Sequence, residues 1–131
     1  MNFYIKKYYD MTDKQIKYGS LTFSTQNLGD EIQTIASDQF IPNPDARFDR
    51  DKMALVEDDH EKYITILNGW FTHHPEDCFP PAKPIIPIFL SFHIAYPYKY
   101  HFEKKESIEY FKKHEPIGCR DRGTMEFLRE N

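Results

Sequence analysis

The chain is poor in cysteine and has no long apolar segment. Cys78 and Cys119 lie far apart, so they provide neither a disulfide framework nor a Cys-x-x-Cys motif, and we expect both thiols to be reduced. No stretch is long and apolar enough to span a bilayer. The start of the chain, residues 1–9, is basic and aromatic but lacks the apolar centre of a signal peptide. The sequence therefore predicts a cytoplasmic protein.

Positive charge and nucleotide-binding motifs are also scarce. Lys and Arg number 17 against 21 Asp and Glu, and they are not clustered, which argues against a nucleic-acid-binding protein. Neither GxxxxGK[ST] nor GxGxxG occurs in the sequence. His73, His74 and Cys78 lie close together, but adjacent histidines point apart and no fourth ligand is evident. We predict no metal site and no cofactor.

What the chain does contain is the composition of one folded domain. Its 131 residues are 40% hydrophobic and 29% charged, which is typical of a globular chain of single-domain size. No repeat or low-complexity linker divides it, so we predict a lead-in over residues 1–17 and one domain over 18–131. The many aromatic side chains are expected to fill the core. Alternatively, some of them line a sugar platform or cover a partner surface.

Strand and helix patterns alternate along the chain. Apolar, β-branched runs predict strands over residues 18–25, 46–50, 63–67, 88–94 and 116–119. Apolar residues at helical spacing predict helices over residues 32–40, 105–114 and 122–130. Residues 72–87 contain five prolines and are predicted to form a loop. This alternation predicts a Rossmann-like, three-layer α/β domain with a largely parallel sheet.

The first candidate site segment, residues 27–30, follows the first predicted strand. Ligands of parallel sheets bind outside the carboxyl ends of the strands, beside helix N-termini. Gly29 permits a tight turn, and either Asn27 or Asp30 can cap the following helix. Asp30 is the candidate general base that accepts a proton from a sugar hydroxyl. The alternative, which composition favours, is that Asp30 caps the helix.

The second candidate segment, residues 68–74, follows the apolar strand over residues 63–67. Asn68, Trp70 and His73 place an amide, an indole and an imidazole at that strand's exit, where they can bind a sugar. The alternative is that Trp70 and Phe71 pack the domain while the histidines are solvated.

The third candidate segment, residues 120–124, follows the last predicted strand. Arg120 can bind a phosphate or a carboxylate, with Asp121 beside it. The alternative is a structural ion pair between Arg120 and Asp121 or Glu115. Either Asp121 or Thr124 can start the following helix.

Taken together, these segments resemble a known family. Asn27-Leu-Gly-Asp30 is similar to the N-x-G-D element of polysaccharide pyruvyl transferases. Asn68-Gly-Trp70 is similar to that family's middle segment, and Arg120-Asp-Arg-Gly-Thr124 to its R-D-x-x-S/T element. The order and spacing of the three segments, within residues 18–131, make the chain resemble the N-terminal half of such an enzyme.

The resemblance implies one half of a GT-B-like architecture, in which two Rossmann-like halves face each other across a cleft. Such enzymes transfer a pyruvyl group from phosphoenolpyruvate to two hydroxyls of a glycan or glycan precursor. Asp30 and Asn27 would orient the acceptor, while Arg120 and Asp121 border the cleft. Family members bind the donor mostly through the second half, which would begin where this sequence ends. We therefore expect a domain that is incomplete alone and acts with a C-terminal partner half or by self-association.

Two other functions remain open at this stage. One is a non-catalytic glycan-binding or dimerising module with the same fold, for which the aromatic segment from Trp70 to Phe79 is the supporting feature. The other is a fragment resembling a glycosyltransferase that uses a nucleotide sugar.

Overall fold

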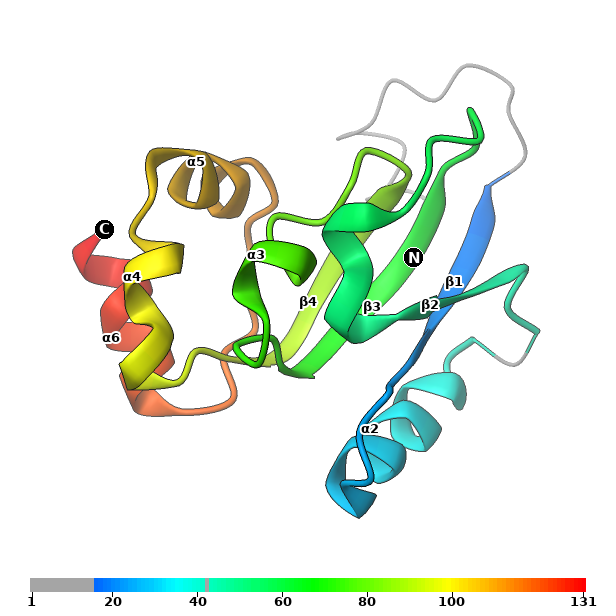
Figure 1. Ribbon diagram of the computed structural model, residues 1–131, viewed down its shortest axis with the longest axis horizontal. Helices are drawn as coiled ribbons and strands as arrows, with labels where there is room; N and C mark the ends of the chain where they lie inside the picture. Colours follow the sequence, from blue (N-terminus) through cyan, green and yellow to red (C-terminus); the bar gives the residue numbers. More distant parts are fainter. Residues whose placement is uncertain (1–15, 42) are drawn as a thin grey trace.

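Four parallel strands form a sheet within residues 16–41 and 43–131, the part of the chain that the computed structural model describes (Figure 1). The strands are β1 (Lys17–Thr22), β2 (Ala46–Asp49), β3 (Tyr63–Trp70) and β4 (Ile85–His93). Their order across the sheet is β2-β1-β3-β4, and every neighbouring pair is parallel. The prediction of an α/β domain with a parallel sheet is confirmed.

Helical segments connect the strands and continue beyond β4. They are α2 (Leu28–Asp38), η1 (Arg50–Leu55), α3 (Pro75–Cys78), η2 (Tyr96–Tyr98), α4 (Lys99–Phe102), α5 (Lys105–Lys113) and α6 (Arg122–Glu130). The β1–β2 and β2–β3 connections run in opposite directions across the sheet, so right-handed crossovers place α2 and η1 on opposite faces. Side chains of β3 agree with this, since Asn68 bonds to α2 while Leu67 joins a core cluster with Met53 of η1.

This strand order fixes where a ligand site is expected. The chain passes from β1 to β2 on one side, then returns to β3 on the other side of β1. The connection that leaves β1 runs to one side and the connection that leaves β3 runs to β4 on the other side, so the carboxyl ends of β1 and β3 border a crevice at this switch point. Figure 1 shows the segment that leads into α2 emerging from this end of β1.

An aromatic cluster forms the centre of the core beside β4. Phe79 stacks on Phe111 with ring centroids 4.7 Å apart, and Phe71 stacks on Phe92 at 5.0 Å. All four rings are at most 3% exposed. Such ring pairs contribute about 0.5–1.5 kcal/mol each beyond simple burial. The expectation that aromatic residues fill the core is confirmed for this cluster.

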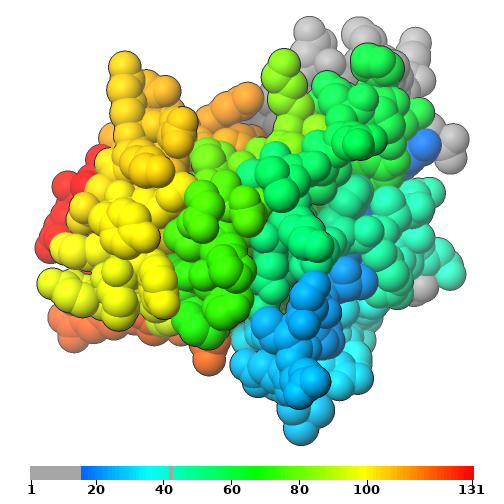
Figure 2. Space-filling view, in the orientation of Figure 1, coloured from blue at the N-terminus to red at the C-terminus, as the bar shows by residue number. Residues whose placement is uncertain are grey.

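The apolar stripe of α2 faces solvent instead of the core. Leu28, Ile32 and Ile35 are 67%, 58% and 59% exposed, and Phe40 just beyond the helix is 66% exposed. Figure 2 shows α2 projecting at one end of the molecule. The helical spacing of these residues correctly predicts a helix, but the covered face is the one that carries Ser37 and Asp30.

The predicted strand over residues 116–119 is the main error in the secondary structure. Only Cys119 forms a ladder bridge, to Phe92, although Phe92 N–H donates to Gly118 O at 2.8 Å. Pro116 has no N–H to donate, and a ladder cannot extend through it. A Cβ on Gly118 would lie 2.8 Å from Phe89 O, so this close backbone approach requires glycine.

Several boundaries also differ from prediction. α2 begins at Leu28, four residues before the predicted start, while β1 ends at Thr22 and β3 continues to Trp70. The predicted loop over residues 72–87 contains α3 and the start of β4. Pro87 is tolerated in β4 because its register partner lies on β3 and, within the described residues, no strand pairs with β4 at that level on the other side.

The remaining predictions of secondary structure agree with the observed elements. The predicted helices over residues 105–114 and 122–130 correspond to α5 and α6, and the predicted strand over residues 46–50 corresponds to β2. Of the predicted lead-in, residues 1–15 lie outside the described part, and Lys17 already belongs to β1. Among the described helices, none has the length and apolar content needed to cross a bilayer.

Candidate functional site

A pocket of about 660 Å³ opens at the carboxyl ends of β1, β3 and β4. It is lined by Asn27, Gly29, Asp30, Gln33, Trp70, His93, Ala95, Arg120 and Asp121. Residues from all three predicted segments therefore meet at the switch point of the sheet, as expected for a doubly wound α/β domain. Asn68 and His73 are the two predicted site residues that do not line it.

The first segment is held by a helix cap. Asn27 has extended backbone, and its Oδ1 accepts a hydrogen bond from Gly29 N–H at 2.9 Å. Asn27 is thus the cap of α2, and the alternative in which Asp30 caps the helix is wrong. Asp30 lies inside the first turn of α2 instead.

Asp30 is bound on both of its oxygens. Arg50 Nη1 donates to Oδ1 at 2.6 Å and Nη2 donates to Oδ2 at 3.2 Å, while Thr25 Oγ1 donates to Oδ2 at 2.5 Å. Burial acts to raise the pKa of Asp30, but these hydrogen bonds outweigh it and hold the pKa below its usual range. A carboxylate stabilised in this way is a weak proton acceptor, so the environment of Asp30 favours an anchoring role. Its predicted catalytic role stays a prediction.

The third segment is organised by Asp121, which caps α6. Asp121 Oδ1 accepts a hydrogen bond from Thr124 N–H at 2.9 Å, and Oδ2 accepts one from Thr124 Oγ1 at 3.0 Å. Thr124 Oγ1 in turn accepts from Ile94 N–H at 3.0 Å, which ties the start of α6 to the end of β4. Of the two residues predicted to start this helix, Asp121 is the cap.

His93 is the site residue that the sequence analysis missed. It ends β4, is the register partner of Trp70 on β3, and places Nδ1 2.5 Å from Asp121 Oδ2. Partial burial acts to raise the pKa of Asp121, but hydrogen bonds with His93 and Thr124 hold it below its usual range. The available signal was the position of His93 near the end of a predicted strand.

Arg120 carries the positive charge of the pocket. Its backbone N–H donates to Phe92 O at 2.8 Å, which fixes the chain where it leaves the sheet. Among the described residues, Asp121 pairs with His93 and no ion pair joins the Arg120 guanidinium to Asp121 or Glu115, so the structural alternative for Arg120 is not found. The Arg120 charge contributes to the lowered pKa of Asp30, so its field acts across the pocket.

The two predicted residues outside the pocket serve elsewhere. Asn68 Nδ2 donates to Gln33 O at 2.8 Å and so ties β3 to α2. His73 is exposed and lies edge-on to His74, with ring centroids 4.5 Å apart.

Cys78 is fully buried, and burial, with a smaller effect of Asp51, raises its pKa to about 12. Within residues 16–41 and 43–131, no three His, Cys, Asp or Glu side chains form a group that could hold a metal ion.

Two polar atoms beside the pocket have unmet hydrogen-bonding capacity. Trp70 Nε1 and Gln33 Oε1 are buried and lack partners among the described residues. One is a donor and the other an acceptor, and both side chains line the pocket. A hydroxyl group, which is both donor and acceptor, has the hydrogen-bonding capacity that matches this donor and this acceptor.

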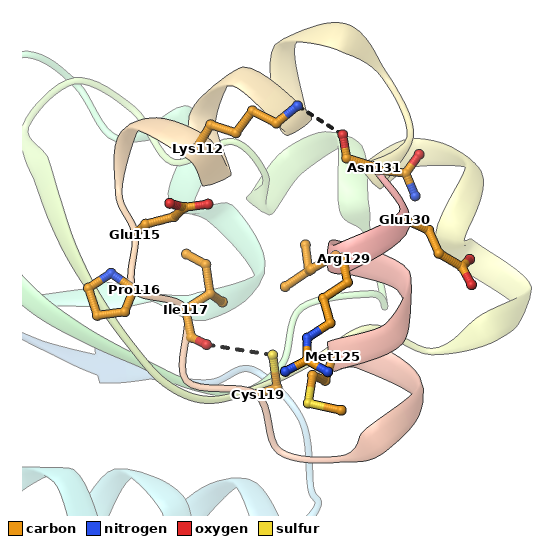
Figure 3. A pocket seen from close by; sticks show the side chains of 10 residues that line it. Lys112, Glu115, Pro116, Ile117, Cys119, Met125, Arg129, Glu130 and Asn131 are labelled. Carbon is orange, nitrogen blue, oxygen red and sulfur yellow. Dashed lines mark hydrogen bonds between the residues drawn. The ribbon is translucent and has the colours of Figure 1, made fainter.

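A larger pocket of about 1030 Å³ lies elsewhere, between α5, α6 and residues 115–119 (Figure 3). Lys112 Nζ donates to Asn131 O at 2.9 Å on one side of it, and Cys119 Sγ points to Ile117 O at 3.6 Å. None of the predicted site residues lines this pocket. Among the described residues, the lining of this larger pocket has no paired acid and base, so its size alone does not make it a candidate catalytic site.

Fold and site together define an α/β protein with a doubly wound parallel sheet and a polar pocket at its switch point. No family model, no curated protein and no solved structure matches the chain.

Proposed function

We propose that this chain is the acceptor-side domain of a polysaccharide pyruvyl transferase-like enzyme, which transfers a pyruvyl group from phosphoenolpyruvate to glycan hydroxyls. The observation that carries the proposal is the composition of the switch-point pocket. Six of the eight predicted site residues line it, although they come from three separate segments of the chain. The predicted cytoplasmic location and the GT-B-like pairing of two halves belong to the same proposal.

The lining of the pocket suits a sugar. The indole of Trp70 offers an apolar face for the C–H groups of a sugar ring. Asp121 and Asn27 place oxygen acceptors nearby, and Arg120 adds donors. A glycan presents both kinds of surface, with apolar ring faces and a rim of hydroxyls, so this mixed lining supports a carbohydrate acceptor.

Binding of phosphoenolpyruvate, the donor of the pyruvyl group, requires further residues. Phosphoenolpyruvate carries a phosphate and a carboxylate, and phosphoryl groups are normally held by several cations. Arg120 and His93 are the basic side chains among the described residues that line the pocket. We therefore propose that the cluster of cations that binds the donor belongs to a second Rossmann-like half.

Acceptor binding can be tested on the chain itself. Saturation-transfer NMR would be recorded with a panel of methyl glycosides of galactose, glucose, mannose and N-acetylglucosamine, on the wild type and on Trp70→Ala. We expect saturation transfer from the wild type and its loss in Trp70→Ala. Tyr100→Ala is the matched control, because Tyr100 is aromatic and 60% exposed but lies outside the pocket. Binding by no glycoside, or equal binding by Trp70→Ala, would contradict the proposal.

A non-catalytic glycan-binding module with the same fold is the second candidate. It is favoured by the arrangement at Asp30, whose two oxygens are already engaged by Arg50 and Thr25. Because the proposed donor cations belong to a second half, phosphoenolpyruvate is added to the glycoside-bound chain together with a purified C-terminal half of a polysaccharide pyruvyl transferase. Phosphate release together with a new ketal methyl signal in the NMR spectrum supports the transferase, while glycoside binding without either supports the module.

A further inference from the structure

His93 and Asp121 form a hydrogen-bonded pair that the proposed function does not yet use. His93 ends β4 and Asp121 caps α6, so two different elements bring the side chains together. Both residues line the 660 Å³ pocket, and both also line a neighbouring pocket of about 360 Å³. The pair thus stands where the two pockets meet.

Asp121 is fixed in place before any ligand arrives. Both of its oxygens accept hydrogen bonds from Thr124, one from the backbone N–H at 2.9 Å and one from Oγ1 at 3.0 Å. Thr124 is completely buried and is itself tied to Ile94 N–H. In a single rotamer, the Asp121 carboxylate therefore both caps α6 and accepts a hydrogen bond from the His93 imidazole.

This fixed carboxylate determines which nitrogen of His93 carries the proton. An ionised carboxylate has no hydrogen to donate, so the contact of 2.5 Å between Asp121 Oδ2 and His93 Nδ1 requires a proton on Nδ1. In the neutral imidazole, Nε2 then carries the lone pair. No described residue hydrogen-bonds to Nε2. An acceptor nitrogen, oriented by a carboxylate on its far side, is the arrangement of a general base.

The position of His93 relative to Trp70 connects this base to a substrate. The two residues are register partners on the adjacent strands β4 and β3. Both line the same pocket, so a sugar ring on the indole face has its hydroxyls near the imidazole. The side chain of His93 is 30% exposed, in contrast to Asp30, whose side chain is 6% exposed.

We propose that His93 is a catalytic base for glycan hydroxyls and that Asp121 is its positioning residue. The hydroxyl O–H bond breaks, an N–H bond forms at Nε2, and the electron pair stays on the oxygen, which becomes the nucleophile. Asp121 stabilises the resulting imidazolium. This inference rests on the proposed function for the identity of the substrate. A structural ion pair, with both ring nitrogens protonated, is the competing explanation.

The tautomer of His93 can be measured without any substrate. Long-range nitrogen–proton correlation NMR on nitrogen-15-labelled chain reports which ring nitrogen is protonated. We expect the neutral imidazole to carry its proton on Nδ1 and its lone pair on Nε2. In Asp121→Asn, the amide can donate to Nδ1 and the tautomer should invert. Asn is as good a helix cap as Asp, so this variant should fold.

Chemical modification gives an independent readout. Diethylpyrocarbonate acylates unprotonated imidazole nitrogen, and mass spectrometry of peptides assigns each site. We expect His93 to be modified at least as fast as the exposed His73, and on the order of tenfold more slowly in Asp121→Asn. His73 in the same samples is the internal control and should keep its rate. Protection of His93 by a methyl glycoside that binds the chain would show that the bound sugar covers Nε2.

The outcomes separate this inference from the proposed function. A His93 ring protonated on both nitrogens and unreactive to the reagent would overturn the acid–base pair, whatever the glycan result. The expected tautomer and reactivity, with no binding of any glycoside, would leave the pair supported and the proposed acceptor wrong.

Discussion

Asp30 and Arg50 form a bidentate ion pair at the edge of the candidate site, with side chains that are 6% and 4% exposed. Asp30 lies in the first turn of α2, and Arg50 begins η1 directly after β2. The pair thus joins two elements that cover opposite faces of the sheet. It also fixes the turn that presents Asn27 and Gly29 to the pocket.

We predict that breaking this pair strongly destabilises the domain. Arg50→Met leaves the Asp30 carboxylate buried without its cation, which typically costs about 3–5 kcal/mol. Urea unfolding followed by circular dichroism measures the loss. The matched control is Arg47→Met, because Arg47 pairs with Asp38 at 3.2 Å but has a side chain that is 51% exposed. That exposed pair should contribute less than about 1 kcal/mol.

The double variant Arg50→Met with Asp30→Leu separates the cost of an unpaired charge from the loss of packing. Replacing Asp30 as well should recover the part of the loss that comes from its unpaired charge, whereas Asp51, which also accepts from Arg50 at 3.3 Å, stays unpaired and keeps the rest of the loss. A single variant as stable as the wild type would show that Arg50 does not hold Asp30 in solution.

The ion pair between Asp30 and Arg50 should also make the stability of the fold depend on pH. The pKa of Asp30 is lower in the folded state than its ordinary value of 3.8. The ionised carboxylate therefore stabilises the fold above about pH 4, and this contribution is lost as the pH falls through the folded pKa. We expect the wild type to be more stable than Asp30→Asn at neutral pH, with the difference shrinking in acid. Urea titrations of both proteins at several pH values measure it, and a constant difference would contradict the prediction.

Gly69 should be intolerant of substitution. Its φ of 103° lies in a region that favours glycine, and a Cβ at this position would collide with Oε1 of Gln33. Backbone strain of this kind costs about 1–3 kcal/mol. Gly69→Ala should therefore lower the midpoint of thermal unfolding. Adding Gln33→Ala removes the collision but not the strain, so only part of the loss should return, and complete recovery would show that φ plays no role.

The local patterns of the sequence predict strands better than they predict long-range pairs. Apolar, β-branched runs identify β3 and β4. The strand exits indicate Asp30, Trp70 and Arg120 as site candidates, and the three line one pocket because parallel strands end at one edge. The partner of Asp30 lies 20 positions away, and that of His93 lies 28 positions away. Neither pairing follows from a local period, because each depends on how two elements pack.

The stripe on α2 shows a second limit. Helical spacing predicts that Ile32 and Ile35 share a face of a helix, and they do. It does not predict which face the sheet covers, and here both side chains are more than half exposed. The spacing of apolar residues predicts that a helix forms, whereas the face of the helix that becomes buried depends on how the other elements pack against it.

The two cysteines should react very differently with thiol reagents. Cys78 is completely buried, and burial raises its pKa to about 12, so the thiolate is nearly absent at neutral pH. Cys119 is partly exposed, although burial raises its pKa as well. Under native conditions iodoacetamide should label Cys119 slowly and Cys78 only when the domain unfolds, as peptide mass spectrometry would show. Because Arg50→Met destabilises the fold, it should accelerate labelling of Cys78 much more than that of Cys119. Equal labelling of the two thiols in the native wild type would mean that the core around Cys78 opens without global unfolding.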